Sequence, residues 1–561
     1  MPWLAPRAAW RFTLVPFLDF QSSTVQMHYI SAALLGISLI LASPAPASAT
    51  QSASLAPGGS PTAAAERMLG GTVRRGNTGF RVVRLSNGSS LGRGTDGCTS
   101  SSSGNLYEVT LYDTPNEWEE VFILGVPLNP ESSLSPLLMG FHQFEVSERD
   151  FCLNTDFFDE ALGRGWYVVA PRGAVQFNFG YPKAQDNTEL VLDFCLAYLG
   201  HAIDDERIYG VGFSMGGTWM SSQAARHLDG SRARFAALIN HTGAVDVAQV
   251  YDQSCDDDCD PPNCGGCKVT CGASCQYDIP DYLNALFGAP PVDEDFAYRQ
   301  VSLIELVTCL PFYSPGVTPS AWGTQGVGSW CVDGETDFGQ NLLGTPMVLF
   351  YLPGDAGPSG TVNSEQLDIL HDHLANTLGG TLCELWNTDP GTAHEWNTLD
   401  VAQACDYLAA QSLSEPVAAW TTTTADRDAR WYDMDVTQEM AEAPTRWTWK
   451  LDPEHTTHQL FELENTQNLG TLTLHCTAAG FETSSGAREI KVTLSRGSGD
   501  DLVESDEVVL TGFTVKPTVD IAENGTPIFG EDYDFDPVSG RLTLYRHAWP
   551  GSGSIDWIIA P

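Results

Sequence analysis

Basic residues are scarce in this sequence. Its 561 residues include 28 lysines and arginines against 71 aspartates and glutamates, which gives a formal net charge of −43. A surface of this sign repels phosphate backbones and anionic lipid head groups, so we expect neither nucleic acid nor a membrane surface as a partner. The acidic residues are spread along the chain rather than gathered in one tail, so the charge marks no separate binding segment.

Long apolar runs are also missing. A membrane-spanning helix needs about 20 apolar residues, and the longest candidate, residues 29–42, is shorter than that. An A-x-A site at 47–49 follows this run, and the combination is typical of a signal peptide. We therefore predict a signal peptide over residues 1–49, with Met27 as an alternative start. The mature protein is expected to be secreted, extracellular or periplasmic, without a membrane anchor.

Cysteine, by contrast, is plentiful. The chain contains 14 cysteines, and six of them crowd into one short segment: Cys255, Cys259, Cys264, Cys267, Cys271 and Cys275. An even number of cysteines in an exported protein favours disulfide bonds. One C-x-x-C spacing in the segment leaves a zinc site as the alternative. Six cysteines allow about 15 pairings, so their connectivity stays open.

The chain after the signal peptide shows three hydrophobic patterns. Residues 50–104 are rich in Ser, Ala, Gly and Thr and indicate a low-complexity linker with one early strand at 80–85. Over residues 105–415, apolar runs alternate with segments of helical spacing; the clearest runs are 135–141, 165–170, 207–212 and 346–352. This alternation predicts an α/β domain with a doubly wound, mainly parallel sheet. In such sheets, ligands bind beyond the carboxyl ends of the strands.

Residues 416–561 form the third pattern, an alternation of apolar and polar side chains without helical spacing. Short strands with Gly and Asp turns predict an antiparallel β-sandwich accessory domain. Its aromatic residues, among them Trp447 and Trp449, fit either a hydrophobic core or a platform for a polymeric substrate. The acidic run at 532–536 lacks the glutamate that closes a calcium loop, so it indicates an acidic hairpin.

One short motif in the α/β region carries chemistry. Gly212-Phe213-Ser214-Met215-Gly216 ends an apolar run and precedes a helical segment. Strand, G-x-S-x-G and helix together form a nucleophile elbow, in which the glycines allow a turn sharp enough to expose the serine hydroxyl. A second G-x-S-x-G match, at 88–92, has no helix after it and is interpreted as loop. Ser214 is therefore the predicted nucleophile.

The serine needs a histidine to take its proton and a carboxylate to orient that histidine. In this fold class their order along the chain is serine, acid, histidine. Asp355 directly follows the strand at 346–352, and His394 lies in a later loop, so these two complete the predicted triad. Glu365 and Asp368 remain alternatives for the acid.

Four more residues near the predicted histidine need an interpretation. His371 and His373 fall on a predicted helix and are interpreted as solvated. Cys383 and Cys405 bracket the His394 loop. We hypothesise that a disulfide bond between these two cysteines holds the loop in place.

Two further features are expected around Ser214. An oxyanion hole needs two backbone N–H donors, which we assign to Met215, directly after the nucleophile, and to Gln143, in the turn after the strand at 135–141. His142 in the same turn is interpreted as structural. Residues 243–344 interrupt the alternation of strands and helices and contain the cysteine-rich segment. This insertion forms either a surface excursion or a cap over Ser214.

The segment 204–217, DDERIYGVGFSMGG, resembles the elbow region of α/β-hydrolase esterases of the polyhydroxybutyrate depolymerase and feruloyl esterase type. Upstream, residues 120–127 and 136–142 are similar to the strands that lead to the oxyanion turn of that family. Gln143 stands where the family usually has glycine. The resemblance extends over about residues 106–413. It implies hydrolysis of carboxylic esters, often polymeric ones, without a cofactor or metal.

We therefore expect a secreted serine esterase that acts on bulky or polymeric esters. A serine peptidase of the same fold is one alternative, since it uses the same triad order. A surface or binding protein that retains a hydrolase scaffold without catalysis is another. The acyl group, the alcohol and the oligomeric state are left open.

Overall fold

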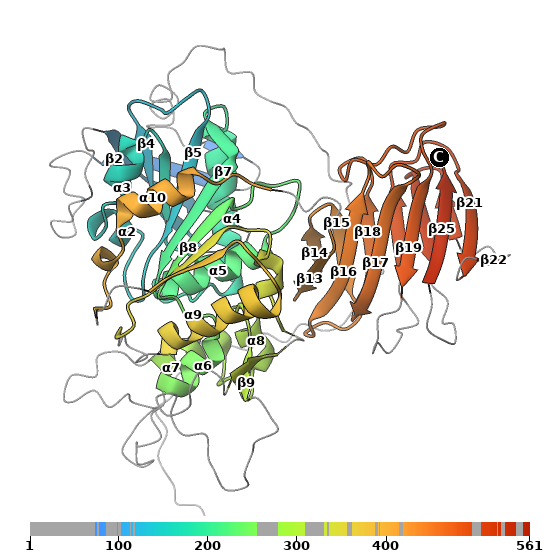
Figure 1. Ribbon diagram of the computed structural model, residues 1–561. Coiled ribbons are helices and arrows are strands. Elements are labelled where there is room, and N and C mark those ends of the chain that lie inside the picture. Colours follow the sequence, from blue (N-terminus) through green and yellow to red (C-terminus); the bar gives the residue numbers. More distant parts are fainter. Residues whose placement is uncertain are drawn as a thin grey trace, which may run out of the picture. The chain divides into compact units, whose positions relative to one another are not determined.

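A computed structural model of the protein (Figure 1) describes residues 73–75, 78–85, 98, 103–112, 114–115, 118–254, 279–308, 330–333, 336–355, 362–387, 391, 393–414, 419–495, 507–523, 526–528, 533–545 and 554–561. The predicted signal peptide, the second G-x-S-x-G match and the cysteine-rich segment 255–275 lie outside these residues. None of the helices within them is both long and apolar enough to cross a bilayer.

A ten-stranded sheet organises the first part of the chain (Figure 1). In the spatial order given below, each pair of neighbouring strands up to the pair β4–β6 is antiparallel, and each pair from β6–β5 onward is parallel. In spatial order the strands are β1 (Val73–Arg75), β2 (Thr78–Leu85), β3 (Gly104–Tyr112), β4 (Glu120–Pro127), β6 (Tyr167–Pro171), β5 (Ser135–Phe141), β7 (Ile203–Phe213), β8 (Ala237–His241), β11 (Met347–Phe350) and β12 (Cys383–Trp386).

Helices cover both faces of this sheet. Every residue of β5 is buried, and its side chains alternate between two core clusters, with Leu137 and Met139 in one and Leu138 in the other. Residues of α4 (Pro182–Leu199), α5 (Met215–Arg226) and α9 (Val362–Asp372) belong to the first cluster; residues of α2 (Asp150–Leu153), α3 (Phe157–Gly163) and α10 (Val401–Ala409) belong to the second. Since a continuous apolar strand needs cover on both sides, the predicted doubly wound, mainly parallel sheet is confirmed.

The described part of the insertion 243–344 shares the first of these cores. It contains α6 (Val247–Ser254), α7 (Ile279–Phe287), α8 (Asp295–Arg299), β9 (Leu306–Thr308), β10 (Trp330–Val332) and the short helix η3 (Gly339–Leu342). Val250, Leu283 and Tyr298 from these helices pack in the same cluster as Leu137 and Met139. These helices are thus part of the main core rather than a loose surface excursion.

Two further sheets form the C-terminal part. One has the order β13-β16-β17-β19-β25-β21-β22 and the other β14-β15-β18-β20-β24-β23. The strands are β13 (Thr421–Ala425), β14 (Ala429–Trp431), β15 (Met434–Gln438), β16 (Thr445–Asp452), β17 (Gln459–Gln467), β18 (Leu469–His475), β19 (Ile490–Ser495), β20 (Glu507–Thr511), β21 (Thr518–Glu523), β22 (Thr526–Ile528), β23 (Tyr533–Asp536), β24 (Arg541–Tyr545) and β25 (Ser554–Ala560).

One prediction for this part needs correction, and one open alternative is decided. Most pairs are antiparallel, but β17 runs parallel to β19 and β18 runs parallel to β20, so neither sheet is purely antiparallel. The residues Trp447, Trp449 and Trp557 are at most 1% exposed and lie in one shared core cluster. Rings buried to this extent have no face to offer a substrate, so these tryptophans form a core and not a binding platform.

Several polar contacts join this part to the sheet that precedes it. Arg226, the last residue of α5, donates from Nε to Asp426 at 2.7 Å, and both side chains are buried. Its guanidinium also lies over the Phe338 ring. Asn341 donates to the Thr424 carbonyl at 2.8 Å. A buried arginine requires such partners because an unpaired charge away from water is very unfavourable.

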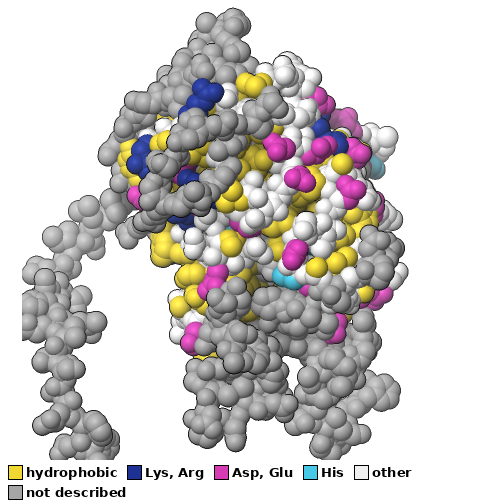
Figure 2. All heavy atoms as spheres, turned by 90° about the vertical axis from the view of Figure 1, so that its left-hand side faces the viewer, with side chains coloured by type: hydrophobic (Ala, Val, Ile, Leu, Met, Phe, Trp, Pro, Cys, Tyr) yellow, Lys and Arg dark blue, Asp and Glu magenta, His cyan; other side chains and the backbone are white. Residues whose placement is uncertain are grey.

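The acidic residues are spread along the sequence, and their side chains are also spread over the surface shown in Figure 2. On the face shown in Figure 2, acidic side chains are scattered among apolar and uncharged ones rather than gathered in one patch.

Candidate active site

Ser214 occupies a strained turn between β7 and α5. Its backbone has φ 54° and ψ −124°, a region that residues with a Cβ rarely adopt and that is typical of functional sites. A Cβ on Gly212 would lie 2.2 Å from the Gly216 carbonyl oxygen, and one on Gly216 would lie 2.1 Å from that of Phe141. Both positions therefore require glycine. The Ser214 N–H donates to the His241 carbonyl at 2.8 Å, which ties the turn to the neighbouring strand.

Asp355 and His394 meet beyond the carboxyl end of β11. The Nδ1 atom of His394 lies 3.0 Å from Oδ1 and 2.9 Å from Oδ2 of Asp355. The carboxylate is buried, and the Gly354 N–H donates to the Gly391 carbonyl at 2.9 Å, so the two loops are joined by their backbones as well. Because β7, β8 and β11 are parallel neighbours, their carboxyl ends lie at the same edge as Ser214.

The His394 ring packs against the residue that precedes Ser214. Its centroid is 4.6 Å from that of Phe213, and its Nε2 atom is buried without a hydrogen-bond partner among the described residues. Nε2 therefore makes no hydrogen bond to the Ser214 hydroxyl in this structure. Catalytic contacts of this kind are often long before substrate binds. With Nδ1 directed at a carboxylate, Nε2 is the nitrogen left to exchange a proton.

A second histidine lies at this site, and the sequence did not single it out. His241 is the last residue of β8; its ring centroid is 4.5 Å from Phe213, and its Nε2 lies 3.0 Å from Thr398 Oγ1. Burial, followed by the nearby His394, holds its pKa well below the usual range. The signal for His241 was its position two residues after an apolar run at 235–239 beside the elbow strand. Trp396 packs on the same Phe213 ring and donates from Nε1 to Asp150 at 2.8 Å.

The alternative residues have other partners. Asp368 accepts a hydrogen bond from the Tyr351 hydroxyl, so this carboxylate is engaged away from His394. Glu365 lies on α9. His373 is not a solvated helix residue as expected, because its Nε2 lies 2.7 Å from the buried carboxylate of Asp337. His371 is in the last turn of α9.

The expected disulfide between Cys383 and Cys405 is wrong. Both residues carry free thiols. Cys383 packs against the core on one face of the ten-stranded sheet, and Cys405 belongs to the core on the other face. The sheet itself therefore separates the two sulfur atoms. The backbone bond from Gly354 to Gly391 and the contact of Trp396 with Asp150 anchor the His394 loop instead.

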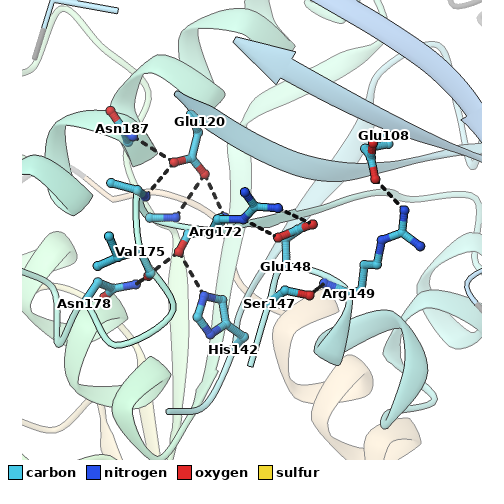
Figure 3. Close-up of polar contacts among 12 residues, drawn as sticks. Glu108, Glu120, His142, Ser147, Glu148, Arg149, Arg172, Val175, Asn178 and Asn187 are labelled. Atoms are coloured by element: carbon cyan, nitrogen blue, oxygen red, sulfur yellow. Dashed lines mark hydrogen bonds and ion pairs between the residues drawn. The ribbon is translucent and has the colours of Figure 1, made fainter. Parts of the chain in front are cut away.

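The turn after β5 is held by a buried polar network, drawn in Figure 3. His142 directs Nε2 at the Arg172 carbonyl, at 2.9 Å (Figure 3). Its Nδ1 lies 2.7 Å from the Gln143 carbonyl oxygen. The side chain of Arg172 makes two bonds to Glu148, at 2.7 and 2.9 Å. His142 thus has the structural role predicted for it, since both ring nitrogens are engaged with backbone carbonyls.

Glu120 holds the backbone of Arg172, whose carbonyl faces His142. Its carboxylate accepts the backbone N–H groups of residues 172, 173 and 174, at 2.7 to 3.0 Å, and the side-chain amide of Asn187, at 2.8 Å (Figure 3). Burial raises the pKa of Glu120, and these donors oppose that effect. The buried Glu120 carboxylate therefore stabilises the turn that contains Gln143, through residues 172–174 and His142. Neither Gln143 nor Met215 donates its backbone N–H to another backbone group in the described part of the chain.

A narrow cavity of about 20 Å³ opens beside Ser214. Its lining comes from the turn after β5, from α5, from the start of the insertion and from α9: Phe144, Phe179, Met215, Thr218, Ala244, Val250, Ile279 and Asn363. Among the described residues, no group of three or more His, Cys, Asp or Glu side chains is arranged to bind a metal ion.

No protein-family model matches this sequence, and no curated protein sequence matches it. Among solved structures the chain is similar to carboxyl esterase 2 from the fungus Tuber melanosporum (16% identity, 55% of this chain and 86% of that one, TM-score 0.35). It is also similar to an S-formylglutathione hydrolase from Agrobacterium tumefaciens (13%, 55% and 96%, 0.34) and to an acetyl xylan esterase from Paenibacillus sp. R4 (12%, 63% and 92%, 0.35). With identities and TM-scores this low, the activity has to be inferred from the side chains themselves.

Proposed function

We propose that this protein is a serine hydrolase that cleaves carboxylic esters through an acyl-enzyme on Ser214. The observation that carries the proposal is the paired contact of both Asp355 oxygens with Nδ1 of His394, next to Phe213 and the strained Ser214. An isolated G-x-S-x-G turn or an isolated Asp–His pair occurs for many structural reasons. Their meeting at one sheet edge is what a triad requires.

In the proposed reaction, Ser214 Oγ bonds to the carbonyl carbon of the ester while its proton moves to Nε2 of His394. Asp355 stabilises the imidazolium through Nδ1, and the Met215 and Gln143 N–H groups bind the negative carbonyl oxygen. When the tetrahedral intermediate collapses, the C–O bond to the alcohol breaks and the alcohol takes the proton from Nε2. Water then repeats the sequence on the acyl-enzyme and releases the acid, so no cofactor is needed.

The position of Met215 adds to the proposed oxyanion hole. It is the first residue of α5, where unpaired backbone N–H groups and the helix dipole favour negative charge. The substrate is proposed to be a bulky or polymeric ester, of the polyhydroxyalkanoate, polyester or feruloyl type. Residues 105–415 are proposed to form the catalytic domain, and residues 416–561 an accessory domain.

A fluorophosphonate probe tests the proposal directly, because it reacts with activated serines. We expect one label on Ser214, located by peptide mapping, and none on the Ser214→Ala protein. Hydrolysis of p-nitrophenyl esters should exceed that of matched peptide anilides. Folded protein that takes no label would leave a binding role on a hydrolase scaffold, and faster anilide cleavage would indicate a peptidase.

Export is also proposed, and two thiols offer a test of it. Cys98 Sγ donates to the Arg149 carbonyl at 3.5 Å, and the neighbouring Cys152 thiol raises the pKa of Cys98. A disulfide oxidant of an oxidising compartment would take two electrons from this pair and release two protons, which leaves a Cys98–Cys152 bond. Trypsin cleaves after Arg149 and separates the two cysteines, so a non-reduced digest of exported protein should contain a pair of peptides linked through Cys98 and Cys152. Two free thiols there would contradict export through such a compartment.

A further inference from the structure

The residues that line the narrow cavity beside Ser214 indicate which part of the ester it can hold. Its lining includes Phe144 from the turn after β5 and Thr218 from α5, but neither His394 nor Trp396. In the proposed reaction the departing alcohol takes a proton from His394, so the alcohol must lie on the His394 side. A cavity that is lined by Ser214 but not by His394 is therefore the place for the acyl group.

The insertion supplies one wall of this cavity. Val250 of α6 and Ile279 of α7 line it, and their side chains are 2% and 4% exposed. The helix α7 is anchored to the turn after β5, because the Tyr282 hydroxyl donates to Glu145 at 2.5 Å and its ring packs 5.2 Å from Phe144. The wall is thus fixed to the same turn that carries Gln143.

The size of the cavity limits what it can hold. About 20 Å³ is room for one water-sized group. A methyl group is of that order, whereas each further methylene of an alkyl chain would have to displace Val250, Ile279 or a phenylalanine ring. Protein interiors are close-packed, so such displacements are unfavourable.

Two polar atoms in the lining of the cavity also favour a short acyl group. Thr218 Oγ1 and Asn363 Oδ1 are buried and have no hydrogen-bond partner among the described residues, while the Asn363 amide is oriented by its 2.9 Å bond to the Thr242 carbonyl. A long alkyl chain would seal both oxygens away from water without a partner, which costs free energy.

We propose that this cavity is the acyl site and admits an acetyl-sized acyl group, with α6 and α7 of the insertion setting the limit. The substrates are then acetyl esters of a bulky alcohol that remains outside the cavity. This inference rests on the proposed function, which it makes specific. It also assigns the described part of the insertion a role in substrate selection.

The test compares kcat/KM for p-nitrophenyl acetate, butyrate and octanoate. Since one methylene in a hydrophobic pocket changes the rate by about 10-fold or more, we expect acetate to exceed octanoate by at least about 100-fold. Ile279→Ala and Val250→Ala each enlarge the cavity, so each should raise the octanoate-to-acetate ratio by about 10-fold. Val292→Ala, at an 87% exposed position of the same insertion, is the matched control and should leave the ratio unchanged.

Failure of this inference differs from failure of the proposed function. If Ser214 takes the fluorophosphonate label but octanoate is cleaved as fast as acetate, the acetyl-sized site is excluded and the esterase remains. The same holds if both enlarged variants fold, take the label and keep the original ratio. If Ser214 takes no label and no ester is cleaved, the proposed function fails and the acyl site fails with it.

Discussion

The ten-stranded sheet and the two C-terminal sheets are built from similar buried strands, yet they differ in where polar chemistry collects. In the ten-stranded sheet, β7, β8 and β11 are parallel, so the residues at or just after their ends, Ser214, His241 and Asp355, share one edge. In the C-terminal sheets most neighbours are antiparallel, so successive carboxyl ends alternate between opposite edges. Strand direction thus decides whether side chains far apart in sequence can meet.

The interiors of the two regions differ as well. Residues 105–414 bury many charged groups, among them Glu120, Glu189 and Asp246. Among the described residues from 419 onward, Asp426 is the one buried side chain that carries a formal charge, and four buried tryptophans fill the core. Buried charge is unfavourable unless it is bonded, and it is retained where it positions or performs chemistry. The first region therefore buries charged groups together with the proposed catalytic residues, whereas the interior of the second is almost entirely apolar or uncharged.

The largest effect is expected from Ser214→Ala. Removal of the nucleophile should lower kcat by about 10⁴-fold or more, as in other enzymes that act through a serine triad. Thermal unfolding should show no loss of stability, because the alanine removes no core contact. Ser539→Ala, in a C-terminal turn, is the control and should keep full activity. If Ser539→Ala lowered kcat as much as Ser214→Ala, the proposal that catalysis belongs to the ten-stranded sheet and not to the C-terminal sheets would be contradicted.

Asp355→Asn should come next. The amide keeps the size of the carboxylate but no longer stabilises the imidazolium, so kcat is expected to fall by about 10²- to 10⁴-fold. Asp368→Asn is the matched control, because Asp368 is bonded to Tyr351 rather than to His394. Initial rates at saturating ester measure both. A greater loss in Asp368→Asn would transfer the role of the acid to that residue.

Trp557→Ala tests the other region. Trp557 is fully buried, so its truncation should lower the free energy of unfolding by about 3–5 kcal/mol. The rate per labelled Ser214 should stay unchanged, since the cavity that opens is in the C-terminal core. Trp420→Ala, at a position 48% exposed, should change stability by no more than about 0.5 kcal/mol. Urea unfolding with active-site titration distinguishes these results from loss of catalysis.

The smallest effect concerns pH. Burial raises the pKa of Asp246 to about 7, far above that of an unfolded aspartate, so the folded state binds its proton more tightly. The stabilisation is complete below the unfolded pKa, about 4, and is lost as the pH rises through about 7. Asp246→Asn should remove about 1–3 kcal/mol of this pH dependence between pH 4 and 8. Asp534→Asn, an exposed control, should keep the wild-type slope; an unchanged slope in Asp246→Asn would contradict the assignment.

The sequence by itself determined the local features. The glycines at 212 and 216 require the sharp turn around Ser214, and the apolar runs require buried strands, because both follow from backbone sterics and burial within a few residues. The chain order of Ser214, Asp355 and His394 also followed from the sequence, as did the structural role of His142. These statements needed no knowledge of distant contacts.

Only the tertiary structure decided the rest. It joined Asp355 rather than Asp368 to His394, brought His241 beside Phe213, and made Val250 and Ile279 line the same cavity as Ser214. It also separated Cys383 from Cys405 and buried the tryptophans that the alternating pattern left open between core and platform. Each of these outcomes depends on which strands are neighbours and on which face of a sheet a side chain lies. That choice is made by the packing of the whole core, which no local pattern in the sequence contains.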